Sequence, residues 1–301
     1  MVRLSPDGVL VVDKPGKATS HDIVAQARRI FGTREVGHAG TLDPMATGVL
    51  LLLFGEATKL SAFLTRDSKR YRATISLGKA TDSLDADGRT TEEAPIRSDQ
   101  ITEQSVEAAL MVERARRSQV PPAVSAIKVD GQRAYALTRA GKAPELPERE
   151  VSVTSLVLVG REGHQLTVEV EASKGYYVRA LARDLGASLG VPAHLSQLRR
   201  LASGRFGLSD ACAWPSTSSA PLVPTAEAAR RALPCAVLAA TGERRASLGQ
   251  KLEPADFASL GGAPPTETEA WFSEAGALIC LGHERAPGEF RVVRGFRSPA
   301  L

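Results

Sequence analysis

The stretch GHAGTLDPMATGVL, from Gly37 to Leu50, holds one His and one Asp among small and turn-forming residues. The apolar run that starts at Val49 and ends at Phe54 predicts a strand buried on both faces. A loop anchored to such a strand can hold a carboxylate rigidly, so Asp43 is a candidate for acid, base or nucleophilic chemistry. A simpler interpretation stays open, in which Asp43 forms an Asx turn and His38 is a hydrogen-bonded loop residue.

The elements around this loop follow from periodicity and turn chemistry. We expect strands at 8–13, 49–54, 71–78, 151–159 and 165–172, and helices that start near Ser20, Thr102 and Tyr177. Ser20 is a candidate N-cap of the first helix, and Gly32 is expected to end that helix. The intervening segment 33–47 is predicted to be a loop. The Ser- and Pro-rich segment 215–225 predicts a linker. Beyond it, short runs at 236–239, 277–282 and 291–295 are typical of a small β-barrel.

Charge is distributed unevenly along the 301 residues. The 38 basic residues exceed the 34 acidic ones only slightly, but segments 114–142 and 174–205 are strongly basic, with a single Asp each. Such stretches are typical of a nucleic-acid footprint, although Arg and Lys also solvate ordinary helix faces. The overall composition, 43% hydrophobic and 24% charged, indicates one large and one small globular domain.

The sequence argues against several other site types. Cys212, Cys235 and Cys280 are scattered and form no CxxC or Cys/His cluster, which predicts neither a disulfide framework nor a zinc site and fits the cytoplasm. The acidic loop 82–88 is not a calcium loop, because Ser83 and not an Asp stands at its first position. No apolar run is long enough for a signal peptide or a membrane span. We therefore expect no cofactor, no metal and no membrane contact.

Several segments, in order, resemble the family of bacterial tRNA pseudouridine-55 synthases. The loop GHAGTLDPMATGVL carries the closest likeness, down to the Asp before Pro. The other matching segments are VVDKPGKATSHD at 11–22, KRYRATISLGKATDSLDADG at 69–88, PPAVSAIKVDGQRAYALTRAGK at 121–142, SKGYYVRALARDLG at 173–186 and LRRLASGRFGL at 198–208. Together they cover most of residues 8 to 210.

The resemblance implies an α+β fold in two domains. Residues 1–225 would form the pseudouridine synthase catalytic domain, a mixed sheet flanked by helices with an RNA-gripping insertion at about 100–150. Residues 233–301 would form a small PUA-like RNA-binding β-barrel. It further implies a monomer without an obligatory protein partner, whose substrate is tRNA, held by its T arm and also at the acceptor end.

The resemblance also assigns the site residues. It implies that Asp43 is the essential carboxylate, that Tyr71 stacks on the target uracil, and that Arg179 pairs with Asp43. Lys14 is expected to support the active-site loop and is also included among the RNA contacts. The remaining RNA contacts that the resemblance implies are His38, Tyr177, Lys128, Arg133, Arg199 and Arg200.

Residue types leave the chemistry partly open. Asp43 could attack the ribose, attack the uracil ring or remove a sugar proton, since all three begin with the same anion. Tyr71 could transfer a proton, only stack, or be an ordinary core aromatic. Three rival functions are a guide-RNA-dependent synthase of the same fold, a non-catalytic tRNA-folding factor, and a glycoside hydrolase with paired carboxylates. The segment 121–142 argues against the first.

Overall fold

The computed structural model describes residues 6–97, 99–125, 127–129, 131–134, 137, 142, 144, 146–215 and 219–297. For residues 128, 129 and 133 it describes the backbone and not the side chain. Within the described residues, nine strands form one mixed sheet in the order β11-β12-β4-β13-β3-β1-β15, with β14 paired to β13 and β2 paired to β3. The expected α+β class with a mixed sheet is confirmed.

The strands of this sheet come from distant parts of the chain. In chain order they are β1 (Gly8–Lys14), β2 (Val36–Ala39), β3 (Thr47–Phe54), β4 (Lys69–Leu77), β11 (Val153–Glu162), β12 (Gln165–Ala172), β13 (Ala193–Ser203), β14 (Phe206–Gly207) and β15 (Cys212–Ala213). Strand β2 lies inside the segment predicted as a loop, so that prediction was wrong: β2 pairs along four residues with the buried strand β3. Strand β13 was not predicted at all.

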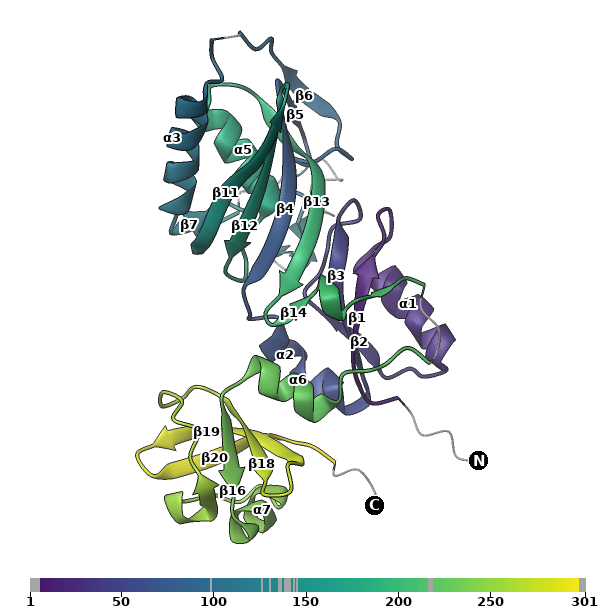
Figure 1. The fold of residues 1–301 in the computed structure, drawn as a ribbon, viewed down its shortest axis with the longest axis vertical. Coiled ribbons are helices and arrows are strands. Elements are labelled where there is room, and N and C mark those ends of the chain that lie inside the picture. The colour runs from purple at the N-terminus through teal and green to yellow at the C-terminus, as the bar shows by residue number, and fades with distance from the viewer. Residues whose placement is uncertain are drawn as a thin grey trace.

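Strand β13 joins two halves of the sheet. It pairs antiparallel with β4 along most of its length, and parallel with β3 at only two positions, Arg199 with Thr47 and Arg200 with Gly48. Figure 1 shows α3 (Glu103–Arg114) and α5 (Val178–Ser188) against one half of the sheet, and α1 (Ser20–Phe31) beside the other. We call this junction of β13 with β3 the seam. It brings the loop before β3 close to the start of α5.

Helix ends follow local side-chain chemistry. Helix α1 is capped by Thr19, whose hydroxyl accepts from the Asp22 N–H, and not by Ser20 as the sequence had suggested. It ends at Gly32, as predicted, in the left-handed region at φ 64°. Helix α3 starts after Thr102, also as predicted, with a reciprocal bond to Ser105.

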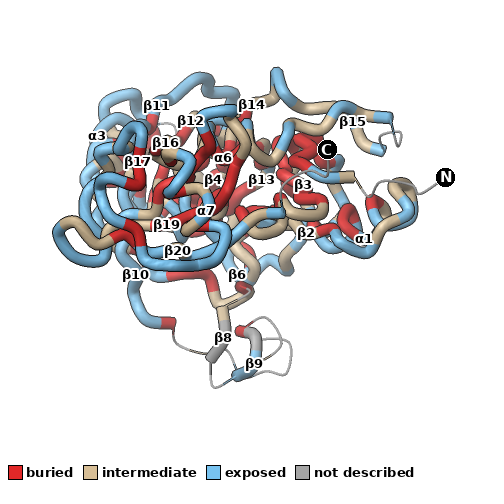
Figure 2. The backbone as a smooth tube through the Cα atoms, turned by 90° about the horizontal axis from the view of Figure 1, so that it is seen from below, coloured by how far each residue is buried: buried red, intermediate tan, exposed pale blue. Residues whose placement is uncertain are grey.

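Burial explains why β3 is almost wholly apolar. Every residue from Val49 to Phe54 is 0% exposed, as expected for a strand covered on both faces. Figure 2 shows these buried stretches along β3, β4 and β13 in the interior, with exposed backbone along α3 and β11 outside. The loop before β3, which contains Asp43, is thus attached to a deeply buried strand.

The C-terminal part has its own five-stranded sheet in the order β17-β16-β18-β19-β20. Its strands are β16 (Cys235–Leu238), β17 (Phe257–Ser259), β18 (Glu269–Ser273), β19 (Leu278–Ala286) and β20 (Glu289–Gly295). The sequence predicted β16, β19 and β20 but missed β17, β18 and helix α7 (Ala240–Ser247). Helix α6 (Thr225–Ala232) links this sheet to the rest, because Arg230 stacks 3.6 Å from the Phe272 ring.

The remaining elements are short. They are η1 (Gly55–Leu60), α2 (Ser61–Leu64), η2 (Leu208–Asp210), η3 (Pro254–Asp256) and the strand pairs β5 (Lys79–Thr81) with β6 (Thr90–Glu93), β7 (Ser118–Gln119) with β10 (Arg149–Glu150), and β8 (Lys128–Val129) with β9 (Gln132–Arg133). None of the described helices is long and apolar enough to span a bilayer.

Gly48 tests how tightly the seam is packed. Its φ is +100°, and a Cβ there would lie 2.2 Å from the carbonyl oxygen of Arg200. Gly163 is also left-handed, at φ +54°, but a Cβ there meets nothing within 4 Å. We expect Gly48→Ala to lower the free energy of unfolding by about 3 kcal/mol or more, and Gly163→Ala by only about 1 kcal/mol. Urea unfolding measures both, and equal losses would contradict a close-packed seam.

Candidate active site

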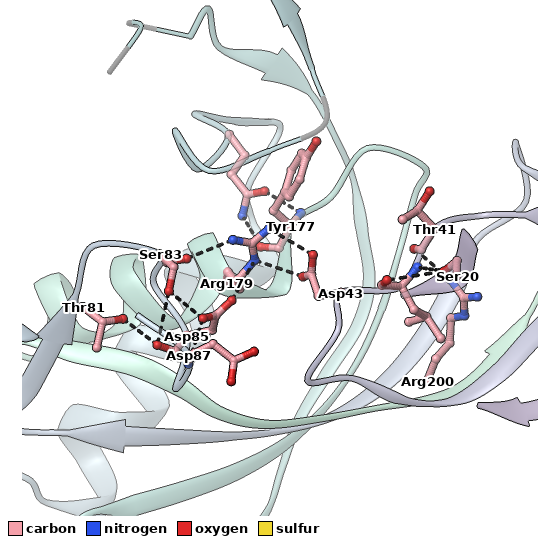
Figure 3. A network of polar contacts seen from close by, with 12 residues as sticks. Ser20, Thr41, Asp43, Thr81, Ser83, Asp85, Asp87, Tyr177, Arg179 and Arg200 are labelled. Carbon is pink, nitrogen blue, oxygen red and sulfur yellow. Dashed lines mark hydrogen bonds and ion pairs between the residues drawn. The ribbon is translucent and has the colours of Figure 1, made fainter. Parts of the chain in front are cut away.

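Asp43 and Arg179 form the central ion pair. Arg179 lies in the first turn of α5 with its side chain 6% exposed, whereas the Asp43 side chain is 33% exposed and so is open to a ligand. The Arg179 Nη2 donates to Asp43 Oδ1 at 3.1 Å, and Nε lies 3.0 Å from Oδ2. Figure 3 shows the carboxylate pointing at the guanidinium. Such a pair fixes the orientation of the carboxylate, as nucleophilic or base chemistry needs.

A second carboxylate, that of Asp85, contacts the same guanidinium. Arg179 Nη1 donates to the Ser83 carbonyl at 2.9 Å, and Asp85 Oδ2 lies 3.6 Å from Nε. Asp85 is 6% exposed and is itself held by the Ser83 hydroxyl at 2.5 Å and the Asp87 N–H at 3.1 Å. The acidic loop, whose contacts the sequence left unassigned, therefore anchors Arg179 (Figure 3).

Lys14 stabilises the loop that carries Asp43. Its side chain is fully buried, and Nζ donates to the carbonyls of Pro15, Ala18 and Pro44 at 2.8, 2.7 and 3.3 Å. Burial, with a contribution from Arg200, lowers the pKa of Lys14 to about 8. All three of its N–H groups are engaged inside the protein, and its assignment as an RNA contact stays a prediction. Its expected support of the loop fits these bonds.

Arg200 also stabilises the loop that carries Asp43, through the carbonyls of Gly40 and Thr41. It is 1% exposed, and it donates to the carbonyls of Val49 at 2.6 Å, Gly40 at 3.0 Å and Thr41 at 3.4 Å. Burial lowers its pKa, and interaction with Tyr71 opposes that shift. Arg200 therefore braces the loop that carries Asp43 (Figure 3), and its assignment as an RNA contact stays a prediction.

Tyr71 lies on β4 opposite Arg200 of β13 and Val170 of β12. It is half-buried and packs against the main hydrophobic core. Among the hydrogen bonds of the described residues, none joins Tyr71 to Asp43. Tyr71 is thus connected to the catalytic loop through Arg200, which contacts both.

Tyr177 borders the ion pair, whereas His38 lies near His21 and Arg200. Tyr177 precedes α5 and lies beside Arg179 and Asp43 (Figure 3), and burial raises the pKa of its hydroxyl. His38 lies on β2, with its ring 5.3 Å from the His21 ring in an edge-to-face arrangement. Its Nδ1 is buried without a hydrogen-bond partner among the described residues.

The other predicted RNA contacts lie apart from this pair. The Arg199 side chain is 39% exposed and forms two bonds with Asp13, at 2.6 and 3.1 Å. Lys128 and Arg133 face each other in the β8–β9 pair, but their side chains lie outside what the structure describes. Within the described residues, no three His, Cys, Asp or Glu side chains are grouped to hold a metal ion.

Comparison with protein families decides what this site belongs to. The model described as "TruB family pseudouridylate synthase (N terminal domain)" matches residues 28–178, and that of the "tRNA pseudouridylate synthase B C-terminal domain" matches residues 179–222. The chain belongs to the TruB family. The first match contains the Asp43 loop and Tyr71, and the boundary between the two falls immediately before Arg179.

One relative matches this TruB-family chain along almost its whole length, and another along about two thirds of it. The "tRNA pseudouridine synthase B" of Thermobifida fusca is 42% identical over 296 residues, covering 95% of this chain and 98% of the relative. That of Mycolicibacterium paratuberculosis is 53% identical over 212 residues, covering 69% and 72%.

Solved structures support the fold. A chain of "Structure of H/ACA RNP bound to a substrate RNA containing 2'-deoxyuridine" superposes with a TM-score of 0.75 at 21% identity, covering 96% of this chain and 85% of that one. A chain of "Crystal Structure of a Cbf5-Nop10-Gar1 Complex" gives 0.75 at 23%, covering 97% and 84%. At these identities the likeness concerns the fold of the TruB-family chain alone.

Two residues of the TruB-family site escaped the sequence-based assignment. Asp85 stands in the acidic loop, whose composition drew attention to it without revealing a partner. Gln119 is 1% exposed and hydrogen bonds the backbone of Tyr177, next to the ion pair. Nothing in its sequence context indicates this contact.

The buried His38 ring makes stability depend on pH. Burial, then His21 and Arg200, lower its pKa to about 4 from 6.5. As pH falls from 6.5 to 4, the unfolded chain takes up a proton that the folded state resists, so the free energy of unfolding decreases. We expect His38→Gln to lose less stability than the parent over this range. Urea unfolding from neutral pH to about pH 4.5 tests this. The exposed His164, changed to Gln, is the control, and parallel curves for parent and His38→Gln would contradict the assignment.

Proposed function

We propose that this TruB-family protein is a tRNA pseudouridine(55) synthase, an isomerase that converts uridine to pseudouridine in the T loop. The observation that carries the proposal is the Asp43–Arg179 pair, in which one carboxylate is both held by a guanidinium and partly open to a ligand. Support comes from the relative named tRNA pseudouridine synthase B that matches 95% of the chain.

The chemistry matches the groups present. The reaction breaks the C1'–N1 bond, turns the base and forms a C1'–C5 bond; C5 loses its proton and N1 takes one up, so the net change is an isomerisation. It needs a carboxylate that stays ionised. Asp43 serves as that group. Arg179, which also contacts Asp85, fixes the position of the Asp43 carboxylate. The target base must leave its stack before Asp43 can reach it, and aromatic contact from Tyr71 replaces part of the lost stacking.

RNA contacts are proposed for residues that can reach the surface. Tyr177 borders the ion pair, His38 is half-buried on β2, and Arg199 is partly exposed on β13. Lys128 and Arg133 remain proposals that rest on the family resemblance. Recognition of the folded arm by shape fits these dispersed contacts better than reading of a base sequence.

The domain limits are likewise proposed, as a catalytic domain at 1–225 with an insertion at about 100–150 and a PUA-like domain at 233–301. The C-terminal sheet contacts the catalytic part through Lys59, which donates to the Gly295 carbonyl at 2.9 Å, and it contacts helix α6, between the two domains, through Arg230 over Phe272. A fixed attachment of this kind suits a second RNA contact at the acceptor end of tRNA. We propose that the protein acts in the cytoplasm as a monomer, without an obligatory partner.

The glycoside hydrolase alternative fits the site poorly. Such enzymes need two carboxyl groups that flank the scissile bond. Here the second carboxylate, Asp85, is buried and contacts the same guanidinium as Asp43, so it does not face a substrate across a cleft. A guide-dependent synthase finds less support than a stand-alone one, because the full-length relative with 42% identity carries the tRNA synthase name.

Replacing the carboxylate should abolish chemistry and spare binding. We expect Asp43→Asn to lower the rate of tritium release from tRNA labelled at uracil C5 by about 10³-fold or more. Its affinity for tRNA should stay within about threefold of the parent, since the amide keeps the shape. The exposed Asp99, changed to Asn, is the matched control and should release tritium like the parent. A parent that binds tRNA without releasing tritium would indicate a folding factor, and release of free uracil would indicate a hydrolase.

Tyr71→Phe separates stacking from proton transfer. The ring remains and the hydroxyl, which interacts with Arg200, is lost. We expect tRNA binding within about threefold of the parent but a single-turnover rate lower by about 10²-fold, because the hydroxyl takes part in moving the C5 proton. A Phe variant that reacts at the parental rate would reduce Tyr71 to a stacking surface. Filter binding and rapid-quench measurements give the two quantities.

A further inference from the structure

The buried side chain of Gln119 connects the base of the predicted insertion to the start of α5. We call this base the neck. The neck is the short pair β7–β10, in which Gln119 lies opposite Arg149 and Ser118 opposite Glu150. Gln119 is 1% exposed, and its amide grips the backbone of Tyr177 on both sides. Its Oε1 accepts from the Tyr177 N–H at 2.9 Å, and its Nε2 donates to the Tyr177 carbonyl at 3.3 Å.

Helix α5 lacks the usual local means of fixing its start. Tyr177 is the N-cap residue, and no side chain caps the helix from that position. In a capping box the residue at N3 would bond the N-cap N–H through a Glu or Gln side chain. Here N3 is Ala180, which has no polar group. Gln119 therefore supplies from a distant strand the bond that a capping box supplies from within the helix.

The first turn of this helix carries Arg179, two residues after Tyr177. The Tyr177 carbonyl also accepts from the Ala180 and Leu181 N–H groups, both at 3.1 Å, so it is the point from which the turn is built. A change in the place of Tyr177 moves the Arg179 backbone with it. The Arg179 bonds to Asp43 and Ser83 then lose their alignment, because their lengths of 2.9 to 3.1 Å leave little tolerance.

We propose that Gln119 is a positioning residue for the reaction: its two bonds to Tyr177 hold Arg179 where it aligns Asp43. The neighbouring contact of the neck, Arg183 Nη2 to the Val120 carbonyl at 3.2 Å, meets α5 beyond its first turn and cannot replace them. The inference rests on the proposed function, since it names a residue that tunes the same carboxylate.

Gln119→Met tests the proposal because a Met side chain has nearly the length of Gln but makes neither hydrogen bond and adds no charge. We expect the single-turnover rate of pseudouridine formation to fall about tenfold while the tRNA dissociation constant stays within about threefold. Ser118→Ala is the matched control from the same strand, and its rate should stay within about twofold of the parent. Thermal unfolding and active-site titration report whether each variant is folded.

A double-mutant cycle separates positioning from a general structural role. If Gln119 acts through Arg179, Gln119→Met should have little further effect in an Arg179→Lys background, with rates equal within about twofold. The proposal is overturned if Gln119→Met still lowers the rate about tenfold in the Arg179→Lys background. It is also overturned if Gln119→Met alone reacts like the parent. If Gln119→Met does not fold, Gln119→Asn, which keeps the amide but shortens its reach, replaces it throughout the cycle and is judged by the same outcomes. A parent enzyme that forms no pseudouridine would instead refute the proposed function.

Discussion

The Asp43–Arg179 ion pair depends on two elements that are remote in sequence and meet only at the seam of the sheet. Asp43 belongs to the loop before β3, and Arg179 to the first turn of α5. An aspartate on a mobile loop would lose side-chain and backbone entropy each time it met the guanidinium. Both partners are therefore fixed in advance, Arg179 by Ser83, Asp85 and the helix start, and Asp43 by the braces of its loop.

The braces are cations bonded to backbone carbonyls. Lys14 and Arg200 each contact three carbonyl oxygens, and Lys69, which is 7% exposed, contacts those of Leu64, Thr65 and Asp67. Burying a charge is costly, and burial lowers the pKa of both lysines to about 8. Carbonyl dipoles offset that cost without a carboxylate partner.

Sequence reasoning found the parts of the site that depend on residue type and missed those that depend on tertiary placement. The loop before a buried strand singled out Asp43, and the helix ends at Thr102 and Gly32 followed from cap chemistry. Strand β13 was missed because register shifts between Leu195 and Gln197 and between Arg200 and Ala202 disturb its alternation. Family resemblance paired Asp43 with Arg179, yet no local rule indicated that Asp85 or Gln119 lies behind the pair.

The two adjacent arginines of β13 show why the RNA contacts could not be assigned from charge alone. Successive side chains of a strand point to opposite faces, so Arg199 and Arg200 have different surroundings although they share a motif. Arg199 is partly exposed and pairs with Asp13, while Arg200 is 1% exposed and bonds the catalytic loop. A basic stretch therefore contributes both exposed cations and internal support for the loop that carries Asp43. The sheet, and not the count of positive charges, decides which residue does which.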